Sequence, residues 1–499
     1  MSSNIIKIII QKISRLFYRF SSTRVAIVVL YTLSYSTLAQ SQDSVEAKVF
    51  SEEDYLEWVK SYHPIMQQAR LLGRQALAYQ LKAKGGFDPK FFGDVEHKTF
   101  DGKNYFTIGD TGLKFPSWLG LEFKAGYYWT NGIFLNPENY LPSSGQAYAG
   151  LSWSLGRGFG IDERRATLQK ASIIQRANEA ERKTIVNDLL LDAGKAYWNW
   201  VQAYNDLKVH QEALELASIR LDGTKNSFFQ GDKPAVDTLE ALIQVQNRQI
   251  NVNDATVAYE NASQTLSNFL WYQNDLPVEV SELLSPPLYQ DLYIVNRSVQ
   301  LADILRDLPE NHPSVQQLRF KLQELEVDRR LKKEQLKPQV DVEFNFLADG
   351  FDFVNQPSDA VDASRFNALL AENYKVGVKV GMPLFFRKER GDLELADLKL
   401  LDTNLKIRQK GQEITNKVIN YNEQLENSIK QITINQTVVD NYQRLLDAEN
   451  EKFRYGESSI FLLNSREQKL VEAQLKFVKL LVTYQKNRLG LIWATGQLQ

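Results

Sequence analysis

The sequence predicts a mainly helical protein that also contains membrane-spanning β-strands and is internally duplicated. Landmarks of the first half recur in the second half, apolar residues follow a coiled-coil spacing over long segments, and short segments between the helices alternate between apolar and polar side chains. The 499 residues exceed one typical core, so the chain forms either several domains or one elongated body.

Composition excludes several classes of function. Lys plus Arg is 59 and Asp plus Glu is 61, a net charge of −2, so no basic surplus indicates nucleic acid. The absence of cysteine excludes disulfides, thiolate metal sites, cysteine nucleophiles and the lipid-acceptor cysteine of lipoproteins. No metal-ligand spacing, phosphate loop or nucleophile elbow appears, and the four histidines are scattered: His63, His97, His210 and His312. We expect no enzyme activity, no cofactor, no metal and no nucleic-acid partner.

The N-terminus has the pattern of an export signal. Basic residues from Lys7 to Arg24 precede an apolar run from Val25 to Leu38, followed by the small residue Ala39. The run is shorter than the roughly 20 residues of a spanning helix, which disfavours the alternative of a membrane anchor. We predict a signal peptide over residues 1–39. Since no later apolar stretch reaches spanning length, strands would have to make any membrane crossing.

The chain contains two copies of one plan. Two landmarks recur 249 positions later (312 − 63 and 338 − 89): His63-Pro64 as His312-Pro313, and Pro89 as Pro338. Two more recur 225 positions later (453 − 228 and 456 − 231): Phe228 as Phe453, and Gly231 as Gly456. Each copy reads as helix, strands, long helix, glycine turn and long helix. The first repeat spans 40–270 and the second 310–499, joined by a linker over 271–309.

Apolar seams predict two antiparallel helical hairpins, over 161–270 with a tip near 231 and over 391–493 with a tip near 456. Apolar residues from Ile185 to Leu221, and again from Ile414 to Leu446, follow alternating steps of three and four, with Ser428 and Asn435 as polar seam positions. Each return helix keeps a seven-residue apolar repeat, which we expect to form its packed seam. The repeat is Val236, Ile243, Ile250 and Val257 in copy one, and Leu463, Leu470, Phe477, Tyr484 and Leu491 in copy two.

Alternating segments predict strands within 88–156 and 338–385. Val340 to Phe346, Tyr374 to Met382 and Ala147 to Leu155 place apolar side chains on one face and small or polar side chains on the other. Each has about the 9 to 11 residues that a tilted strand needs to cross a bilayer. The alternative is the half-buried strand of a soluble sheet, which is commoner overall. The export signal and the Tyr and Trp content favour lipid.

These segments give about four spanning strands per chain. Asp88 to Gly145 is longer than one spanning strand requires, so we expect a strand plus an extended hairpin reaching outside, split by the turn Pro116 to Gly120. Phe351 to Asn373 is predicted to be the second outer loop. Because bacterial barrels need at least eight strands and an open edge is not tolerated in lipid, identical chains must complete the wall.

The hairpin tips carry a resemblance to a known family. Gly231-Asp232-Lys233-Pro234-Ala235-Val236-Asp237-Thr238-Leu239-Glu240-Ala241 and Arg454-Tyr455-Gly456-Glu457-Ser458-Ser459-Ile460, together with the duplicated plan, resemble the TolC-like outer-membrane efflux proteins over essentially the whole mature chain. The resemblance implies a trimeric, 12-stranded transmembrane β-barrel, continued by a long antiparallel coiled-coil α-helical tube into the periplasm of a Gram-negative bacterium. It implies contact with outer-membrane lipid.

The resemblance also implies a function. The chain would be an outer-membrane channel subunit of a tripartite efflux or type I secretion system, passively conducting substrates received from a periplasmic adaptor protein and an inner-membrane RND or ABC transporter. The implied adaptor-contacting tips are Gly231, Asp232, Lys233, Gly456, Glu457 and Ser458.

A periplasmic constriction is implied near the tips. Better-known members carry acidic residues six and nine places after the second glycine, where this chain has Leu462 and Ser465. We therefore expect Phe461 and Leu462 to narrow the tube by apolar contact. Asp237 and Glu240 hold the equivalent places in copy one, with ordinary first-turn helix acids as the alternative reading.

The run from Arg157 to Ala166 resembles the barrel-to-tube junction of the family. Gly158 and Gly160 would let strand turn into helix, and Arg164 and Arg165 would face water below the membrane. The competing hypothesis for the whole chain is a periplasmic or surface coiled-coil adaptor or structural protein without a pore. An adaptor would carry one central hairpin with lipoyl-like and barrel domains, whereas this chain has two hairpins and paired strands.

Overall fold

A computed structural model describes residues 48–273, 276–280, 284–292, 301–349 and 373–498. The predicted signal peptide and residues 351–372 of the predicted second outer loop lie outside these ranges. The chain divides into two units. In the smaller one, β1 (Lys48–Val49) pairs in parallel with β8 (Leu284–Ser285). All other elements belong to the larger unit, which is described by itself below.

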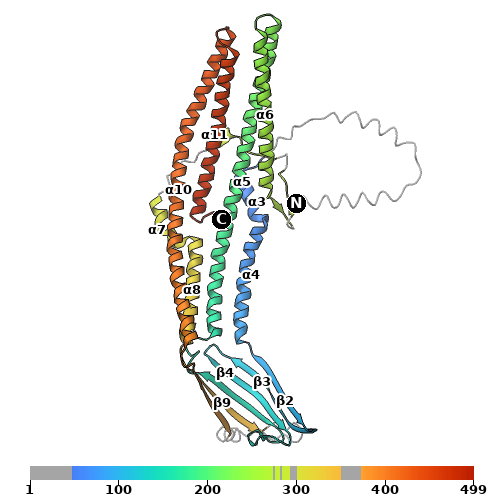
Figure 1. Ribbon diagram of the computed structural model, residues 1–499, viewed down its shortest axis with the longest axis vertical. Coiled ribbons are helices and arrows are strands. Elements are labelled where there is room, and N and C mark those ends of the chain that lie inside the picture. The colour runs from blue at the N-terminus through green and yellow to red at the C-terminus, as the bar shows by residue number, and fades with distance from the viewer. Residues whose placement is uncertain (1–47, 274–275, 281–283, 293–300, 350–372, 499) are drawn as a thin grey trace, which may run out of the picture. The chain divides into compact units, whose positions relative to one another are not determined.

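The larger unit is mostly helical and contains one large curled sheet, which confirms the predicted mainly helical fold with β-strands (Figure 1). Its helices are α3 (Glu52–Tyr62), α4 (Pro64–Lys84), α5 (Glu163–Phe229), α6 (Ala235–Ser267), α7 (Leu301–Asn311), α8 (Pro313–Glu334), α10 (Arg387–Arg454) and α11 (Ile460–Ala494). Its large-sheet strands are β2 (Lys90–Phe100), β3 (Lys103–Pro116), β4 (Leu121–Asn131), β5 (Gln146–Ser154), β9 (Gln339–Asp349) and β10 (Tyr374–Gly381). The short elements are η1 (Gly85–Phe87), η2 (Pro137–Asn139), β6 (Trp271–Tyr272), β7 (Leu276–Pro277) and η3 (Tyr289–Asp291).

Side-chain caps begin several of these helices. Asp162 accepts a hydrogen bond from the Arg165 N–H at 2.8 Å before α5, and Ser459 accepts one from the Leu462 N–H at 3.3 Å before α11. His63 and His312 cap α4 and α8 in the same manner. Among the described helices, none is both long enough and apolar enough to cross a membrane.

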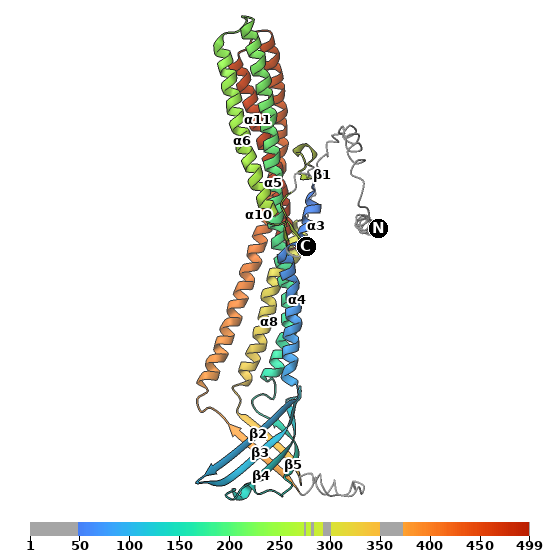
Figure 2. The same ribbon diagram turned by 90° about the vertical axis from the view of Figure 1, so that its right-hand side faces the viewer.

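The helices form a layer that has α6 at one side and α10 at the other. α5 packs against α4, α6, α8 and α11, while α10 packs against α8 and α11 (Figure 2). The buried residues between α10, α11 and the short helices of copy two include Ile414, Val418 and Leu491. α11 therefore lies between two long helices, whereas α6 lies at the copy-one side and α10 at the copy-two side.

This placement corrects the seam expected for the first return helix. In α11 the seven-residue repeat from Leu463 to Leu491 is buried, as expected. In α6 the residues Val236, Ile243, Ile250 and Val257 are instead 48–64 % exposed. The buried positions of α6 include Ala241, Arg248 and Ala255, a different seven-residue repeat. The reason is that α6 packs mainly against one helix of its own chain, so its buried repeat needs only two alanines and the ion-paired Arg248, and the large apolar stripe faces outward.

The sheet has six strands in the order β10-β9-β5-β4-β3-β2, and every neighbouring pair is antiparallel. Its register defines an apolar row that crosses all six strands: Phe91, Leu113, Ala125, Ala149, Phe346 and Tyr374. The neighbouring position on each strand points to the opposite face, where a polar row crosses the sheet: Lys90, Lys114, Lys124, Gly150, Asn345 and Lys375. Alternation along each strand thus gives one apolar face and one polar face.

Six strands are two more than the four spanning strands expected per chain. The additional pair, β2 and β3, comes from the segment for which we expected a strand plus a hairpin reaching outside. That expectation is wrong about the turn Pro116 to Gly120: it lies at the helix side of the sheet, where the Arg165 guanidinium is 3.3 Å from the position of a Cβ on Gly120. The turn is placed there because β2 leaves the helices outward and β3 returns toward them.

Candidate functional site

The polar face of the sheet carries a connected set of charged and polar side chains. Lys124 of β4 forms an ion pair with Glu343 of β9 at 3.1 Å, and Asn345 donates to the same carboxylate at 3.3 Å. One row toward the helices, Asp341 accepts hydrogen bonds of 2.6 Å from both Ser154 and Gln339. Such a face needs water, because its charges would be costly to place against lipid.

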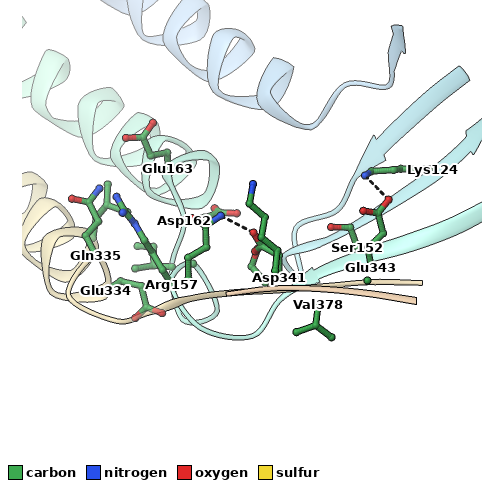
Figure 3. A pocket seen from close by; sticks show the side chains of 17 residues that line it. Lys124, Ser152, Arg157, Asp162, Glu163, Glu334, Gln335, Asp341, Glu343 and Val378 are labelled. Carbon is green, nitrogen blue, oxygen red and sulfur yellow. Dashed lines mark hydrogen bonds and ion pairs between the residues drawn. The ribbon is translucent and has the colours of Figure 1, made fainter. Parts of the chain in front are cut away.

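A pocket of about 620 Å³ lies where this polar face meets the helices (Figure 3). Side chains of β4, β5, β9 and β10 line it together with the start of α5 and the end of α8. In Figure 3, Lys124 and Glu343 point toward each other on the strand side, while Glu334, Gln335 and Arg157 lie on the helix side. The pocket is therefore the place where the polar face of the strands continues into the helical layer.

Glu334 holds the pocket's helix side together. Its carboxylate accepts from the Gly160 N–H at 3.0 Å and pairs with Lys337 at 2.8 Å. Burial acts to raise the pKa of Glu334, but the hydrogen bonds from Lys337 and Gly160 outweigh it, so this carboxyl's pKa lies below its ordinary value. Glu334 stays ionised near neutral pH and anchors the junction loop. The sequence pattern did not single it out, because a lone glutamate near a helix end is common.

The four predicted junction residues lie together beside this pocket. Gly158 has a φ of +96°, a left-handed conformation that favours glycine. Gly160 leaves room for Glu334: a Cβ there would lie 3.1 Å from the carboxylate oxygen Oε2. Arg164 pairs with Glu122 of β4 at 3.3 Å.

Arg165 differs from the expectation that it faces water. Its side chain is only 18 % exposed, and its guanidinium pairs with Asp162 at 3.2 Å. It also donates to the main-chain carbonyls of Gly158 and Phe159. Two backbone carbonyls released where the strand ends are thereby satisfied, so Arg165 stabilises the turn from strand to helix.

The structure brings the two predicted hairpin tips into contact. Gly231 has a φ of +83° and Gly456 a φ of +79°, so each tip uses a left-handed glycine after its long helix. Lys233 of the first tip places Nζ 3.5 Å from the ring centroid of Phe453 at the second. Below the tips, Leu221, Ala241 and Ile460 form a shared core.

The polar tip residues differ in their contacts. Asp232 and Glu457 are exposed. Ser458 donates a hydrogen bond of 2.5 Å to Glu449 of α10, which also pairs with Arg466 of α11 at 3.6 Å. Ser458 therefore tightens the second tip internally.

The predicted constriction residues lie in the first turns of α6 and α11. Phe461, Leu462 and Ser465 are exposed, while the adjacent Leu463 and Asn464 are buried. Asp237 and Glu240 are half-buried. Within the described part of the chain, neither acid forms an ion pair. Phe461 and Leu462 thus point away from the packed core of their own chain.

The helical layer contains a buried charge cluster that was not predicted from the sequence. Glu467 of α11 pairs with Arg220 of α5 and with Arg248 of α6, the latter at 3.5 Å, and both Glu467 and Arg248 are about 1 % exposed. Asn464 accepts from Arg220 at 3.1 Å. Burial lowers the pKa of Arg248, which the Glu467 charge opposes. One signal was present in the sequence: Arg248 lies within the apolar repeat of α6, where a buried arginine needs a charged partner.

Where the structure describes the chain, no group of three or more His, Cys, Asp or Glu side chains could hold a metal ion. What the described residues offer chemically is a wettable polar surface that continues from strands to helices beside an apolar outer face.

Comparisons with known proteins agree with this geometry. The family model of the outer membrane efflux protein matches residues 122–270 and 304–497. Among solved structures, the chain is similar to the CmeC outer membrane channel of Campylobacter jejuni (14% identity, TM-score 0.63, covering 89% of this chain and 85% of that one). It is also similar to VceC of Vibrio cholerae (12% identity, TM-score 0.62, covering 89% of this chain and 96% of that one). A third similar structure is the MtrE outer membrane channel of Neisseria gonorrhoeae (13% identity, TM-score 0.64, covering 90% of this chain and 89% of that one). A search of curated proteins found no match. The matched residues begin at 122, so β2 and β3 lie outside them.

Proposed function

The chain belongs to the outer membrane efflux protein family, and from this premise we propose that it is the channel subunit of a tripartite efflux or type I secretion system. Channels of this family generally form trimers and work with adaptors and inner-membrane pumps. In this proposal three copies close one β-barrel in the outer membrane of a Gram-negative bacterium, and their helices continue it as a tube in the periplasm. The pore is passive.

The observation that carries the proposal is the two-faced sheet, whose two edges have no partner strand among the described residues. Its apolar face suits lipid and its polar face suits a water-filled lumen. In lipid, the open N–H and C=O groups of the edge strands β2 and β10 would lack partners, at a cost of several kcal/mol per group. Identical neighbours remove that cost by closing the wall. β4, β5, β9 and β10 alone would supply the twelve strands that the family resemblance implies for a trimer.

The helical layer supports the same closure. The outward stripe of α6, with Val236, Ile243 and Ile250, lies at the copy-one side of the chain. At the copy-two side, α10 exposes Ile434 and Leu445 in the same tip-side half of the layer. Pairing the copy-one side of one chain with the copy-two side of the next buries both stripes, and such a head-to-tail contact closes into a ring.

The tips are proposed to meet the periplasmic adaptor. Gly231, Asp232, Lys233, Gly456, Glu457 and Ser458 end the two hairpins at one place, since Lys233 contacts Phe453. Substrates would reach them from an adaptor coupled to an inner-membrane RND or ABC transporter. Phe461 and Leu462, with Ser465, Asp237 and Glu240 nearby, are proposed to narrow the tube just inside this end, because the two large apolar side chains point away from their own core.

The test is to express the full chain in a Gram-negative host, extract it from outer membranes and reconstitute it in liposomes. We expect a detergent-soluble trimer that lets small solutes pass without an energy source. Co-purification with a cognate adaptor through the tips would support the tripartite role. A water-soluble monomer that makes no passage would contradict the proposal and favour the alternative, a periplasmic or surface coiled-coil adaptor or structural protein without a pore.

A further inference from the structure

We propose that all six strands of the sheet form the membrane wall, so that β2 of one copy pairs with β10 of the next and three copies close a barrel of eighteen strands. This inference rests on the proposed channel function and deepens it. It differs from the twelve strands implied by the family resemblance, because β2 and β3 lie outside the residues that match the family.

The apolar face does not stop at β4. The apolar row continues from Ala125 through Leu113 to Phe91, and Phe91 and Val95 of β2 are 75 % and 61 % exposed. In a hairpin that stands in water outside the membrane, side chains that continue the apolar row would be exposed to water, which is unfavourable. On the opposite face Lys90 and Lys114 continue the polar row from Lys124.

β2 and β3 are long enough to cross a bilayer. β2 has 11 residues and β3 has 14, against 9 for β5 and 8 for β10. The ten steps from Lys90 to Phe100 of β2, at about 3.3 Å each, give about 33 Å along the strand. A strand tilted by roughly 40° then spans about 25 Å of height, the height of the apolar band between aromatic girdles in outer-membrane barrels.

The directions of the two edge strands allow them to pair. β2 runs away from the helices and β10 runs toward them, because the six antiparallel strands alternate from one edge to the other. Placing β2 beside the β10 of a second copy therefore continues the antiparallel pattern without interruption. Closed outer-membrane barrels are antiparallel with an even number of strands, and six strands per chain meet that condition.

The side chains of β10 and β2 match across the new edge. If β10 of one copy and β2 of the next are aligned at their helix-side ends, Gly381 lies opposite Lys90. This register places Lys375 opposite Glu96 and Lys379 diagonal to Asp94. On the apolar face it places Val380 opposite Phe91. Opposite charges and aromatic–β-branched pairs both stabilise neighbouring strands.

A wall of four strands per chain would bring β10 against β4 instead. That arrangement would break the ten-residue register between β3 and β4, which runs from Thr107–Asn131 to Pro116–Glu122.

Cysteine cross-linking in native outer membranes tests the proposal, and the chain has no cysteine of its own. Lys375→Cys is combined with Asp94→Cys, Glu96→Cys or Lys98→Cys, three neighbouring polar-face positions of β2 that cover adjacent registers. The matched set combines Lys375→Cys with Gly126→Cys, Tyr128→Cys or Thr130→Cys of β4. We expect oxidised dimer and trimer bands in at least one pair of the β2 set, and at least a tenfold weaker signal throughout the β4 set.

The outcomes separate this inference from the channel function. Cross-links only in the β4 set overturn the six-strand wall and leave a trimeric barrel with four strands per chain. No cross-link in either set overturns both. As a second measurement that needs no variant, electron cryo-microscopy of the trimer in lipid nanodiscs should show eighteen strands in the ring, and twelve would contradict the inference.

Discussion

His63 and His312 cap their helices with the same hydrogen bond. In each, Nδ1 accepts from the backbone N–H two residues later at 3.2 Å, from Ile65 in α4 and from Ser314 in α8. The two histidines are 249 positions apart (312 − 63), so the duplicated landmark is conserved in geometry between the copies as well as in sequence. Because Nδ1 is the acceptor, each imidazole must be neutral to act as a cap.

This relationship predicts a loss of stability in acid. Burial lowers the pKa of His312 to about 4 from an ordinary value of 6.5, and Lys410 adds to the effect. Between these values the unfolded chain binds more protons, so the free energy of unfolding falls as pH drops from 6.5 to about 4, by up to about 3 kcal/mol. Thermal unfolding followed by circular dichroism across that range measures it.

The matched variant for this prediction is His312→Asn, which keeps a capping oxygen but does not titrate there. We expect a flatter pH profile with little change in stability at pH 7. A profile as steep as that of the unchanged protein would show that His312 is not the group responsible.

The buried charge cluster predicts a strong response to loss of one partner. Glu467→Ala leaves the Arg220 and Arg248 guanidiniums without their shared counter-charge, and we expect a loss of about 3–5 kcal/mol. Asp402→Ala is the control, because Asp402 forms an exposed pair with Lys406 at 2.7 Å, and such pairs contribute at most about 1 kcal/mol. Denaturant unfolding compares the two variants.

Replacing all three buried charged residues with apolar residues tests whether the cluster can be removed as a unit. Arg220→Met, Arg248→Leu and Glu467→Met together should recover most of the stability lost in Glu467→Ala, since apolar residues of similar volume can substitute for a buried ionic cluster. A triple variant less stable than Glu467→Ala would show that the three helices need these charges for packing.

Replacing glycine with alanine is expected to have opposite effects on stability at a hairpin tip and inside a helix. Gly231→Ala places a side chain at a φ of +83° and should cost about 1 kcal/mol. Gly223→Ala should instead stabilise by up to about 1 kcal/mol, because Gly223 is inside α5 with open space around it. Equal effects of the two substitutions in thermal unfolding would contradict the left-handed tip.

The outward stripe of α6 predicts a contact between copies. Ile250→Asp should weaken the trimer, because it places a charge where the proposed neighbour buries an apolar side chain. Gln249→Glu changes an exposed polar residue that lies about 100° around the same helix from Ile250, and it should leave the trimer intact. The temperature at which the detergent-solubilised trimer dissociates measures both, and equal effects would argue against the contact.

Several features were accessible from the sequence because they depend on local patterns. The alternation from Val340 to Phe346 fixes which side chains share a face, and the register with β10 then pairs Val342 with Val378 as that alternation requires. The buried repeat of α11 was likewise readable, since Leu463 and Leu470 pack on Leu446 and other apolar residues of α10.

Other features depend on placement in the layer, which periodicity does not contain. The α6 stripe has the same seven-residue spacing as that of α11, but α6 lies at the side of the layer, so Ile243 and Ile250 face outward. Arg165 was readable as a junction residue, yet its bonds to the Gly158 and Phe159 carbonyls depend on how the strand ends. The partners of Glu467 lie more than two hundred positions away in the sequence, which no local pattern reveals.

The central claim is that the sheet separates lipid on one face from water on the other, and spin labels along β9 test it most directly. Single cysteines at positions 340–346, in a chain that has none of its own, carry the label in reconstituted trimers. We predict high accessibility to oxygen at 340, 342, 344 and 346, and high accessibility to a water-soluble nickel complex at 341, 343 and 345. An absence of this two-residue alternation, or protection of the apolar positions from oxygen, would contradict the account.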